Sequence, residues 1–461
     1  MPDYRVRFAP VRHPRTHHHL DAASNQAAAH PADQKLQRSR SGCSQCRSHK
    51  VKCDETFPVC VRCLKRGLLC RLSPRLQRWQ VETRWVSSPL GTLVKPRLLQ
   101  YWVEKACQML VIDPENNPYS FPILDYLTRA PSLVHMIQSL SAAHQEYFPA
   151  NGPIMSLEER GRALQLLQRE LAQTKYLEAS FLTVQLLGLS QWADPDPRDF
   201  GQQHLFAARH ILDHLLLNYW DDLAHPGSSE LFSISVGSFL YWDMCCAHLV
   251  DAQEQRPLDT TLMAQAVHTL RNKDHPTYGP ATELIYLLAQ VGRHCRSDIQ
   301  LGRHSDATAR SLEQQLRDFQ APQNNGSLAL LHDSLQKHGL IILRRSASTS
   351  RRKLKDEEND ELHSWAVGIT QSLSQLPLTS TLLNIQSLPL LTAGSELRSS
   401  DTELREIILT RFKAIYSMNR VPSTLQAMTL LKEVWAICDS GIQLSWIEYM
   451  ILHKKWRLVL G

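Results

Sequence analysis

Six cysteines within residues 43–70 have the types and spacing best suited to chemistry. They stand at Cys43, Cys46, Cys53, Cys60, Cys63 and Cys70, so that Cys-x2-Cys-x6-Cys occurs twice, shifted by seventeen residues. Cysteine thiolates bind structural zinc in tetrahedral sites, and closely spaced pairs commonly supply the ligands. The repeat therefore predicts a metal centre. In each half we expect the first two thiolates on a tight turn, and a short helix leading to the third.

The number of ligands predicts two zinc ions in this centre. A structural zinc ion takes about four thiolates, so three cysteines in each half leave each ion one ligand short. Both ions are satisfied if one cysteine of each half bridges them, and the repeat favours the equivalent positions Cys43 and Cys60. The remaining two cysteines of each half would complete one site. Because so small a module cannot fold on its own apolar core, metal binding is expected to supply its folding free energy.

Other roles for the cysteines fit the sequence less well. A disulfide framework belongs to secreted proteins, but the first thirty residues carry no apolar signal segment, so a reducing intracellular compartment is expected. RING and LIM domains use eight ligands at other spacings, and His49 does not stand at such a position. A redox Cys-x-x-Cys pair would need a βαβ setting, which the pattern does not suggest. Metal binding is the interpretation that remains.

Charge is distributed unevenly along the 461 residues. Residues 1–100 hold 19 Lys and Arg against 6 Asp and Glu, a net charge of +13, whereas the remainder carries 32 against 39, a net of −7. A basic end on an acidic body suggests a polyanion-binding segment and a separate globular part. With 43% hydrophobic residues the body can bury a sizeable core. No run of about 18 apolar residues occurs, so no membrane span is expected.

The pattern beyond the cysteines predicts a mainly α protein. Segments of apolar residues spaced by three and four follow one another from residue 96, and strand alternation is scarce. A small two-zinc cysteine module with two short helices is therefore expected ahead of a large all-α domain. The predicted divisions are a disordered basic tail at 1–39, the zinc module at 40–72, a linker at 73–95 and the helical domain at 96–461.

Several helix boundaries can be predicted within the body. Ser156 and Glu159 have the spacing of a capping box at a helix start, and Pro131 stands where a first helical turn would begin. Residues 206–217 form an amphipathic run. Polar breaks are expected near 320–327 and 346–361, and the charged second break is expected to be an exposed loop.

Two segments resemble known families. Residues 42–71, with Pro58 in the loop between the halves, closely resemble the fungal zinc binuclear cluster DNA-binding domain. That resemblance implies the same bridging cysteines. Residues 117–124, 140–144, 207–213 and 253–258 are similar to the fungal-specific transcription factor domain of the acriflavine-sensitivity regulator type. Together they imply a nuclear, sequence-specific transcription factor of the RNA polymerase II type, whose helical domain controls transcription.

Basic residues between the cysteines predict contacts to double-stranded DNA. The candidates are Arg47, His49, Lys50 and Lys52 on a short helix of the first half, and Arg62, Lys65 and Arg66 in the second. A lysine can donate to guanine O6 and N7 in the major groove, whereas the other residues can reach phosphates. The resemblance implies that Lys50 reads a CGG-like triplet. His49 stands where the family most often has Arg or Lys, which leaves that contact open and suggests pH-sensitive binding.

Partners beyond DNA follow less directly from the sequence. A regulator of this kind implies the transcription machinery or co-regulators, and a small-molecule effector between the helices. Residues 71–110 lack sustained heptads, so a dimerisation zipper is not expected. The protein would bind as a monomer or dimerise through its helical domain.

Two other classes of function fit the sequence less well. The chain has no GxSxG, HExxH, P-loop or dinucleotide motif, so no catalytic residue or organic cofactor is predicted and an enzyme is not expected. The cysteines outside the cluster, at 107, 245, 246, 295 and 438, lack metal spacing and are expected to be buried. An adaptor whose zinc module docks protein is the remaining alternative, and binding of specific duplex DNA by residues 38–78 would separate it from a regulator.

Overall fold

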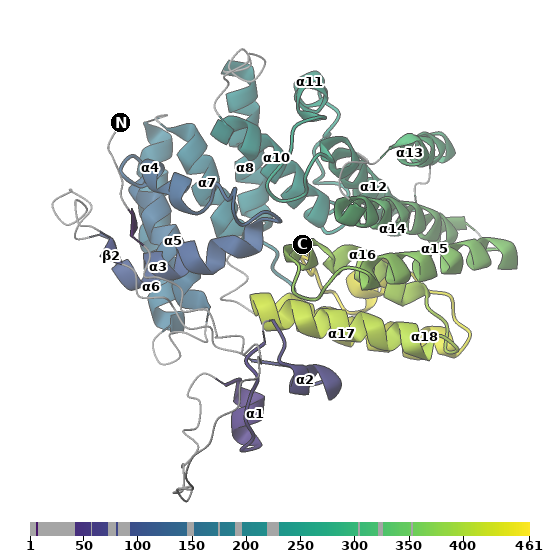
Figure 1. The fold of residues 1–461 in the computed structure, drawn as a ribbon. Coiled ribbons are helices and arrows are strands. Elements are labelled where there is room, and N and C mark those ends of the chain that lie inside the picture. Colours follow the sequence, from purple (N-terminus) through teal and green to yellow (C-terminus); the bar gives the residue numbers. More distant parts are fainter. Residues whose placement is uncertain are drawn as a thin grey trace, which may run out of the picture.

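The computed structural model describes residues 6–7, 42–56, 58–71, 80–81, 93–144, 152–173, 176–189, 196–218, 230–302, 305–320, 326–351 and 354–461. Within these residues the protein is mainly helical, as predicted (Figure 1). Two short strands, β1 (Val6–Arg7) and β2 (Gln80–Val81), pair antiparallel. The rest of the predicted disordered tail, and most of the predicted linker, lie outside the described residues.

The cysteine module has the two short helices expected of it. They are α1 (Ser44–Ser48) and α2 (Val61–Lys65), one in each half of the repeat. Both lie at one end of the molecule, next to α17 (Thr402–Asn419) (Figure 1). The large helical domain therefore carries the module at its surface.

The first part of the helical domain packs around α5. Its elements are α3 (Pro96–Glu104), η2 (Ala106–Leu110), η3 (Phe121–Ile123), α4 (Leu124–Leu127), α5 (Pro131–Ala143), α6 (Gly152–Ala172), α7 (Leu177–Gly188) and α8 (Gln202–Asn218). Every residue of α5 beyond Pro131 is buried, because α3, α6 and α7 all pack against it. The helix begins at Pro131, as the sequence predicted, and α8 covers the predicted amphipathic run.

The middle part of the helical domain packs around α12. Its helices are α10 (Glu230–Cys246), α11 (Thr261–Leu270), α12 (Thr282–Leu301), α13 (Asp306–Asp318), α14 (Gly326–Arg351) and α15 (Asp356–Ser374). Helix α12 packs between α10 and α14, and α15 follows α14 on its outer side (Figure 1). Apolar residues of α12 such as Leu284, Leu288 and Val291 are fully or almost fully buried in this layer.

The C-terminal part packs around α16. Its elements are η5 (Thr381–Ile385), α16 (Ser387–Glu396), α17, α18 (Pro422–Asp439), α19 (Trp446–Glu448) and a short π-helix, η6 (Tyr449–His453). Helix α16 is apolar and packs against α14 and α15 on one side and α17 and α18 on the other. None of the helices in the described part of the chain is long and apolar enough to cross a membrane.

Two predicted boundaries were wrong. Helix α6 begins at Gly152, so Ser156 and Glu159 lie inside it and do not cap its start. The second polar break is much shorter than predicted, because α14 continues to Arg351 and α15 begins at Asp356. The acidic residues 356–358 form the first turn of α15, where the helix dipole favours negative charge. The break near 320–327 does separate α13 from α14.

Glu159 is instead the centre of a buried ion cluster. Its carboxylate lies 2.8 Å from Lys95 Nζ, 2.7 Å from His135 Nδ1 and 2.6 Å from Arg162 Nη1. The Gln138 amide donates to it as well, at 2.8 Å. Burial alone would raise the pKa of Glu159, but the hydrogen bonds and charges of Lys95 and His135 outweigh it and lower the pKa. The cluster ties α5 and α6 to the start of α3.

Glu159→Ala is expected to lower the free energy of unfolding by about 3 kcal/mol, because the partner groups lose their shared acceptor. Because the pKa of Glu159 is lowered in the folded state, its contribution is present above about pH 4.3 and is lost as the pH falls through the folded value. Urea unfolding at pH 7 and at a series of pH values from about 4.3 downward measures both effects. Glu158→Ala is the control, since Glu158 pairs with Arg162 at 3.9 Å on the surface and its loss should cost about 0.5 kcal/mol or less. Equal losses for both variants would contradict the assignment.

Candidate metal centre and nucleic-acid interface

Each half of the repeat positions its cysteines in the same way. The first cysteine precedes the helix and caps it: Cys43 Sγ accepts from Cys46 N at 3.3 Å, and Cys60 Sγ accepts from Cys63 N at 3.4 Å. The second cysteine lies on the helix itself, and the third follows after the helix, outside regular secondary structure. The predicted order of a turn followed by a helix was therefore wrong in detail, because the helix begins between the first and second thiols.

The six sulfur atoms form two overlapping groups of four. One group is Cys43, Cys46, Cys53 and Cys60, the other is Cys43, Cys60, Cys63 and Cys70, and within each the sulfurs lie within 4.8 Å of one another. Sγ–Sγ distances are 3.9 Å for Cys43–Cys60, 3.8 Å for Cys43–Cys63 and 3.8 Å for Cys46–Cys60. A tetrahedron of sulfurs about 2.3 Å from zinc has edges of about 3.8 Å. The buried, all-sulfur donor set thus fits zinc.

The thiols differ in acidity. Burial raises the pKa of Cys70 to about 12, and burial together with the neighbouring thiols raises the pKa of Cys46 and Cys63. At Cys43 burial acts in the same direction, but the N–H of Cys46 and hydrogen bonds from neighbouring thiols outweigh it and lower the pKa to about 7. Because metals bind thiolates, loading of this site must release protons.

Asp54 is a structural residue of the module that the sequence did not single out. Its Oδ1 atom accepts from Thr56 N at 3.1 Å, Thr56 Oγ1 at 2.5 Å and Val61 N at 3.1 Å. Slight burial acts to raise the pKa of Asp54, but these hydrogen bonds lower it to about 2. The carboxylate therefore ties the loop between the halves to the start of α2. An Asp with Thr two residues later is a common turn-forming pattern, and it could have indicated this role.

The predicted DNA-contacting residues of the first half do not all lie on a helix. Arg47 is on α1, His49 is its C-cap, and Lys50 and Lys52 follow in the chain that leaves the helix. All four are exposed. The structure thus brings them to one exposed segment between the second and third cysteines, although the expected helix covers only the first of them.

Lys50 has an unusual backbone conformation. Its φ is 56°, in the left-handed region that glycine favours. Lys50 N donates to Arg47 O at 3.0 Å and Val51 N donates to Cys46 O at 3.0 Å, the two bonds that end a helix in a Schellman motif. In the second half Gly67, with φ 58°, occupies the equivalent position with the same two bonds. The first half therefore holds a lysine where the second has glycine.

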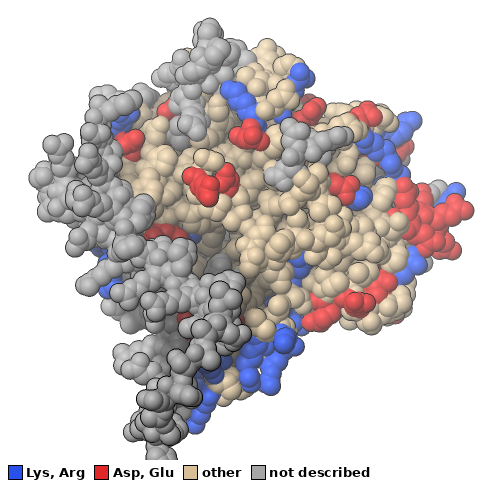
Figure 2. All heavy atoms as spheres, viewed as in Figure 1, with Lys and Arg blue, Asp and Glu red and all other residues tan. Residues whose placement is uncertain are grey.

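The second half presents its own basic side chains. Lys65 and Arg66 are exposed and Arg62 is half-buried, all on or directly after α2. Figure 2 shows Lys and Arg side chains gathered at the end of the molecule where α1 and α2 lie. The module meets the helical domain behind this surface, where Arg420 Nη1 donates to the carbonyl of Cys70 at 3.0 Å. Lys65 and Arg66 remain exposed to solvent.

The other cysteines take no part in this site. Cys107, Cys245, Cys246 and Cys295 are buried, as expected, and Cys438 is half-buried. Burial raises the pKa of Cys107, Cys245 and Cys295 to about 12, which keeps these thiols protonated. They contribute to packing.

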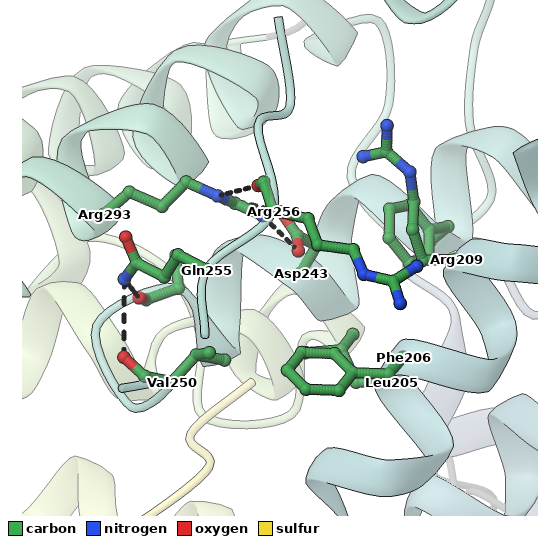
Figure 3. A pocket seen from close by; sticks show the side chains of 10 residues that line it. Leu205, Phe206, Arg209, Asp243, Val250, Gln255, Arg256 and Arg293 are labelled. Atoms are coloured by element: carbon green, nitrogen blue, oxygen red, sulfur yellow. Dashed lines mark hydrogen bonds and ion pairs between the residues drawn. The ribbon is translucent and has the colours of Figure 1, made fainter. Parts of the chain in front are cut away.

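A hollow lined by arginines lies between α8, α10 and α12 (Figure 3). Arg293 donates to both oxygens of Asp243 at 2.7 and 2.6 Å, and Arg209 pairs with Asp213 at 2.8 Å. The guanidinium of Arg256 lies 5.8 Å from the ring of Phe206. The free volume is about 20 Å³, enough for about one water molecule. These charges therefore serve the contact between the helices.

Comparisons with known families cover nearly all of the chain beyond residue 40. Residues 97–461 match the fungal specific transcription factor domain, and residues 41–80 match the fungal Zn(2)-Cys(6) binuclear cluster domain. The two matches correspond to the helical domain and to the cysteine module. No solved structure matches the chain.

Individual relatives match over short stretches of 33 to 49 residues. An aspercryptin biosynthesis cluster-specific transcription regulator of Emericella nidulans is 45% identical over 49 residues, 11% of this chain and 8% of that protein. A Zn(2)-C6 fungal-type transcription factor of Gibberella zeae is 42% identical over 43 residues, 9% of each chain. Another from Aspergillus fumigatus is 52% identical over 33 residues, 7% of this chain and 9% of the relative. The matched segments thus span less than a tenth of these relatives.

Proposed function

The chain belongs to the family defined by the fungal specific transcription factor domain, whose members are transcription factors and not enzymes, and we propose that it is a sequence-specific DNA-binding regulator of transcription by RNA polymerase II. One observation carries the proposal. Two buried groups of four thiols, sharing Cys43 and Cys60, lie directly beside an exposed segment of basic residues. A metal centre of this kind gives a short chain the rigidity that base recognition needs.

The proposed centre holds two zinc ions. Cys43 and Cys60 bridge them, Cys46 and Cys53 complete one site, and Cys63 and Cys70 complete the other. The membership of Cys43 and Cys60 in both sulfur groups supports this assignment. Six thiolates and two divalent ions leave a net charge of about −2 on the cluster, which the surrounding Lys and Arg side chains offset.

DNA recognition is assigned to the segment between the second and third cysteines. Lys50 reads a CGG-like triplet in the major groove, since its exposed amine can donate to guanine O6 and N7. Exposure supports phosphate contacts by Arg47, His49 and Lys52, and by Lys65 and Arg66 of the second half. The half-buried Arg62 is assigned the same role.

The rest of the proposal concerns the whole molecule. Residues 40–72 form the DNA-binding module and 96–461 the regulatory domain, joined by a linker at 73–95 behind a basic tail at 1–39. The protein acts in the nucleus, where the helical domain recruits the transcription machinery or co-regulators and binds a small-molecule effector. It acts as a monomer or as a dimer formed through the helical domain.

Selection of binding sites from random duplex DNA, followed by genome-wide occupancy, tests this function. We expect the full chain loaded with zinc to enrich sites that contain a CGG-like triplet, and the same sites to be occupied in nuclei. A protein that enriches no duplex sequence, while still retaining zinc, would favour the adaptor instead.

Arg62→Gln is expected to weaken binding evenly across DNA sequences, because an interaction with phosphate carries no base information. Removing one phosphate interaction should also reduce the slope of log affinity against log salt by about one. Gel-shift titrations at several salt concentrations, on a selected site and a scrambled site, measure both. The control is Arg271→Gln, an exposed arginine after α11. A weakening confined to the selected site would contradict a phosphate role for Arg62.

A further inference from the structure

A second hollow of the helical domain is large enough for a ligand. It has a volume of about 260 Å³ and lies between α10, the end of α11 and the start of α12. The hollow opens to solvent on the side where the exposed Lys273 and Asp274 lie. For comparison, an apolar cavity of about 150 Å³ can hold benzene. Apolar walls with a few polar groups are the usual composition of small-molecule sites. Ile234, Leu270 and Pro276 supply such walls here.

Two stacked rings on one side of the cavity are held rigidly. The rings of His275 and Tyr278 lie 4.3 Å apart between centroids, inclined by 14°. His275 N donates to Gly279 O at 3.1 Å and Gly279 N donates to His275 O at 2.8 Å, which closes the tight turn that carries both rings. Gly237 of α10 permits their close approach, since a Cβ there would lie 2.4 Å from His275 Cδ2. The cavity is thus formed before any ligand arrives.

His275 lines the cavity with an uncharged imidazole ring. Its Nδ1 accepts from Thr277 N at 3.2 Å, so the proton is on Nε2, which lies 3.2 Å from Ile234 O and 3.3 Å from Ser238 Oγ. Burial lowers the pKa of His275 to about 4, in agreement with a neutral ring. Its hydrogen-bonding groups are therefore engaged by the protein.

The remaining polar groups favour an uncharged ligand. Ser233 and Thr282 line the cavity with hydroxyls, which can donate to or accept from a ligand hydroxyl. Lys273 and Asp274 have opposite charges and are exposed. An ion entering the cavity would lose water without gaining a net opposite charge, which is unfavourable.

We propose that this cavity binds a small, flat, uncharged aromatic molecule that carries a hydroxyl group. The ligand packs against the apolar walls and the ring of His275, which Tyr278 supports by stacking from within the core, and its hydroxyl bonds to Ser233 or Thr282. The proposal rests on the effector part of the proposed function, for which it names a site and a ligand class.

Calorimetric titration of the full zinc-loaded chain tests the site, with 2-naphthol as probe and 2-naphthoate as its anionic counterpart. We expect 2-naphthol to bind once per chain with a dissociation constant below about 1 mM. The carboxylate should bind at least about tenfold more weakly, because it must be desolvated. Absence of saturable 2-naphthol binding up to about 1 mM, or equal binding of both compounds, would overturn the proposal.

Two variants locate the binding. Ser233→Trp should fill the cavity and weaken 2-naphthol binding at least about tenfold, whereas Ser311→Trp, on the exposed face of α13, should leave it unchanged. Thr282→Val keeps the volume and removes a hydroxyl, so it should weaken 2-naphthol but not naphthalene. Thr282→Val is the test variant if Ser233→Trp does not fold, as judged by thermal unfolding of Ser233→Trp. Binding that survives both changes lies elsewhere and refutes the site.

The outcome is independent of DNA binding. Gel shifts on the same protein preparation report on the zinc module, and calorimetry reports on the cavity. Absence of 2-naphthol binding with intact DNA binding refutes the cavity alone, whereas 2-naphthol binding by a chain that binds no DNA refutes the regulator and leaves the cavity standing.

Discussion

Cys60→Ser should yield a chain that holds almost no zinc and binds no specific DNA. Cys60 belongs to both groups of sulfurs, so its loss removes a ligand from both sites at once. The metal supplies the folding free energy of a module this small, and structural zinc contributes about 10–16 kcal/mol in zinc-finger peptides. We therefore expect gel-shift affinity for a selected site to fall at least about a hundredfold.

Zinc content per chain, measured by mass spectrometry of the metal, distinguishes the bridging ligand from the others. The unchanged chain should hold about two ions per chain, and Cys438→Ser, which lies outside the cluster, should hold the same. Cys70→Ser removes a ligand from one group only, so it should retain more zinc than Cys60→Ser. Equal zinc loss in both cluster variants would contradict the shared position of Cys60.

Lys50→Ala should abolish the preference for a selected DNA site while zinc content stays unchanged. The side chain is exposed and is not among the sulfur ligands of the cluster. A good pair of hydrogen bonds to one base contributes about 1–3 kcal/mol of discrimination, or up to about a hundredfold in affinity. Competition gel shifts with the selected and a scrambled site measure the change. Unaltered discrimination would refute the assignment of Lys50.

The Lys50→Gly variant tests DNA recognition separately from the stability of the zinc module. Glycine adopts the positive φ of this position without strain, as Gly67 does in the second half. This variant should therefore be at least as resistant to chelators as the unchanged chain and yet fail to distinguish DNA sites. If the Lys50→Gly variant still distinguished the selected site from a scrambled site, the backbone conformation at this position, and not the lysine amine, would be responsible for that discrimination.

The sequence predicted helices well where local pattern and tertiary packing agree. Pro131 starts α5 because the missing N–H of proline is not needed in a first turn, and α8 follows its apolar spacing. Ser156 and Glu159 were misassigned because the same spacing that forms a capping box also places two polar residues on one face of a helix. The partners of Glu159 come from α5, α6 and the start of α3, and no local pattern reveals them.

The grouping of the six thiols was predictable from the sequence, but the backbone around them was not. Cysteine spacing indicated the overlapping sulfur groups, since the repeat made Cys43 and Cys60 equivalent. The left-handed conformation of Lys50 could not be predicted from lysine itself, which has no preference for it. Comparison with Gly67 seventeen residues later was the available indication. The cavity beside His275 was not predictable, because it depends on how α10, α11 and α12 pack.

The difference between Lys50 and Gly67 makes the two halves of the module unequal. They share the same ligand spacing and the same helix ending. In the second half glycine occupies a position whose backbone it favours, whereas in the first half the exposed Lys50 adopts the same conformation at a cost of about 1 kcal/mol or more of strain. If Lys50 reads DNA as proposed, this strain is the energetic cost of placing an amine at a position that the second half leaves to glycine.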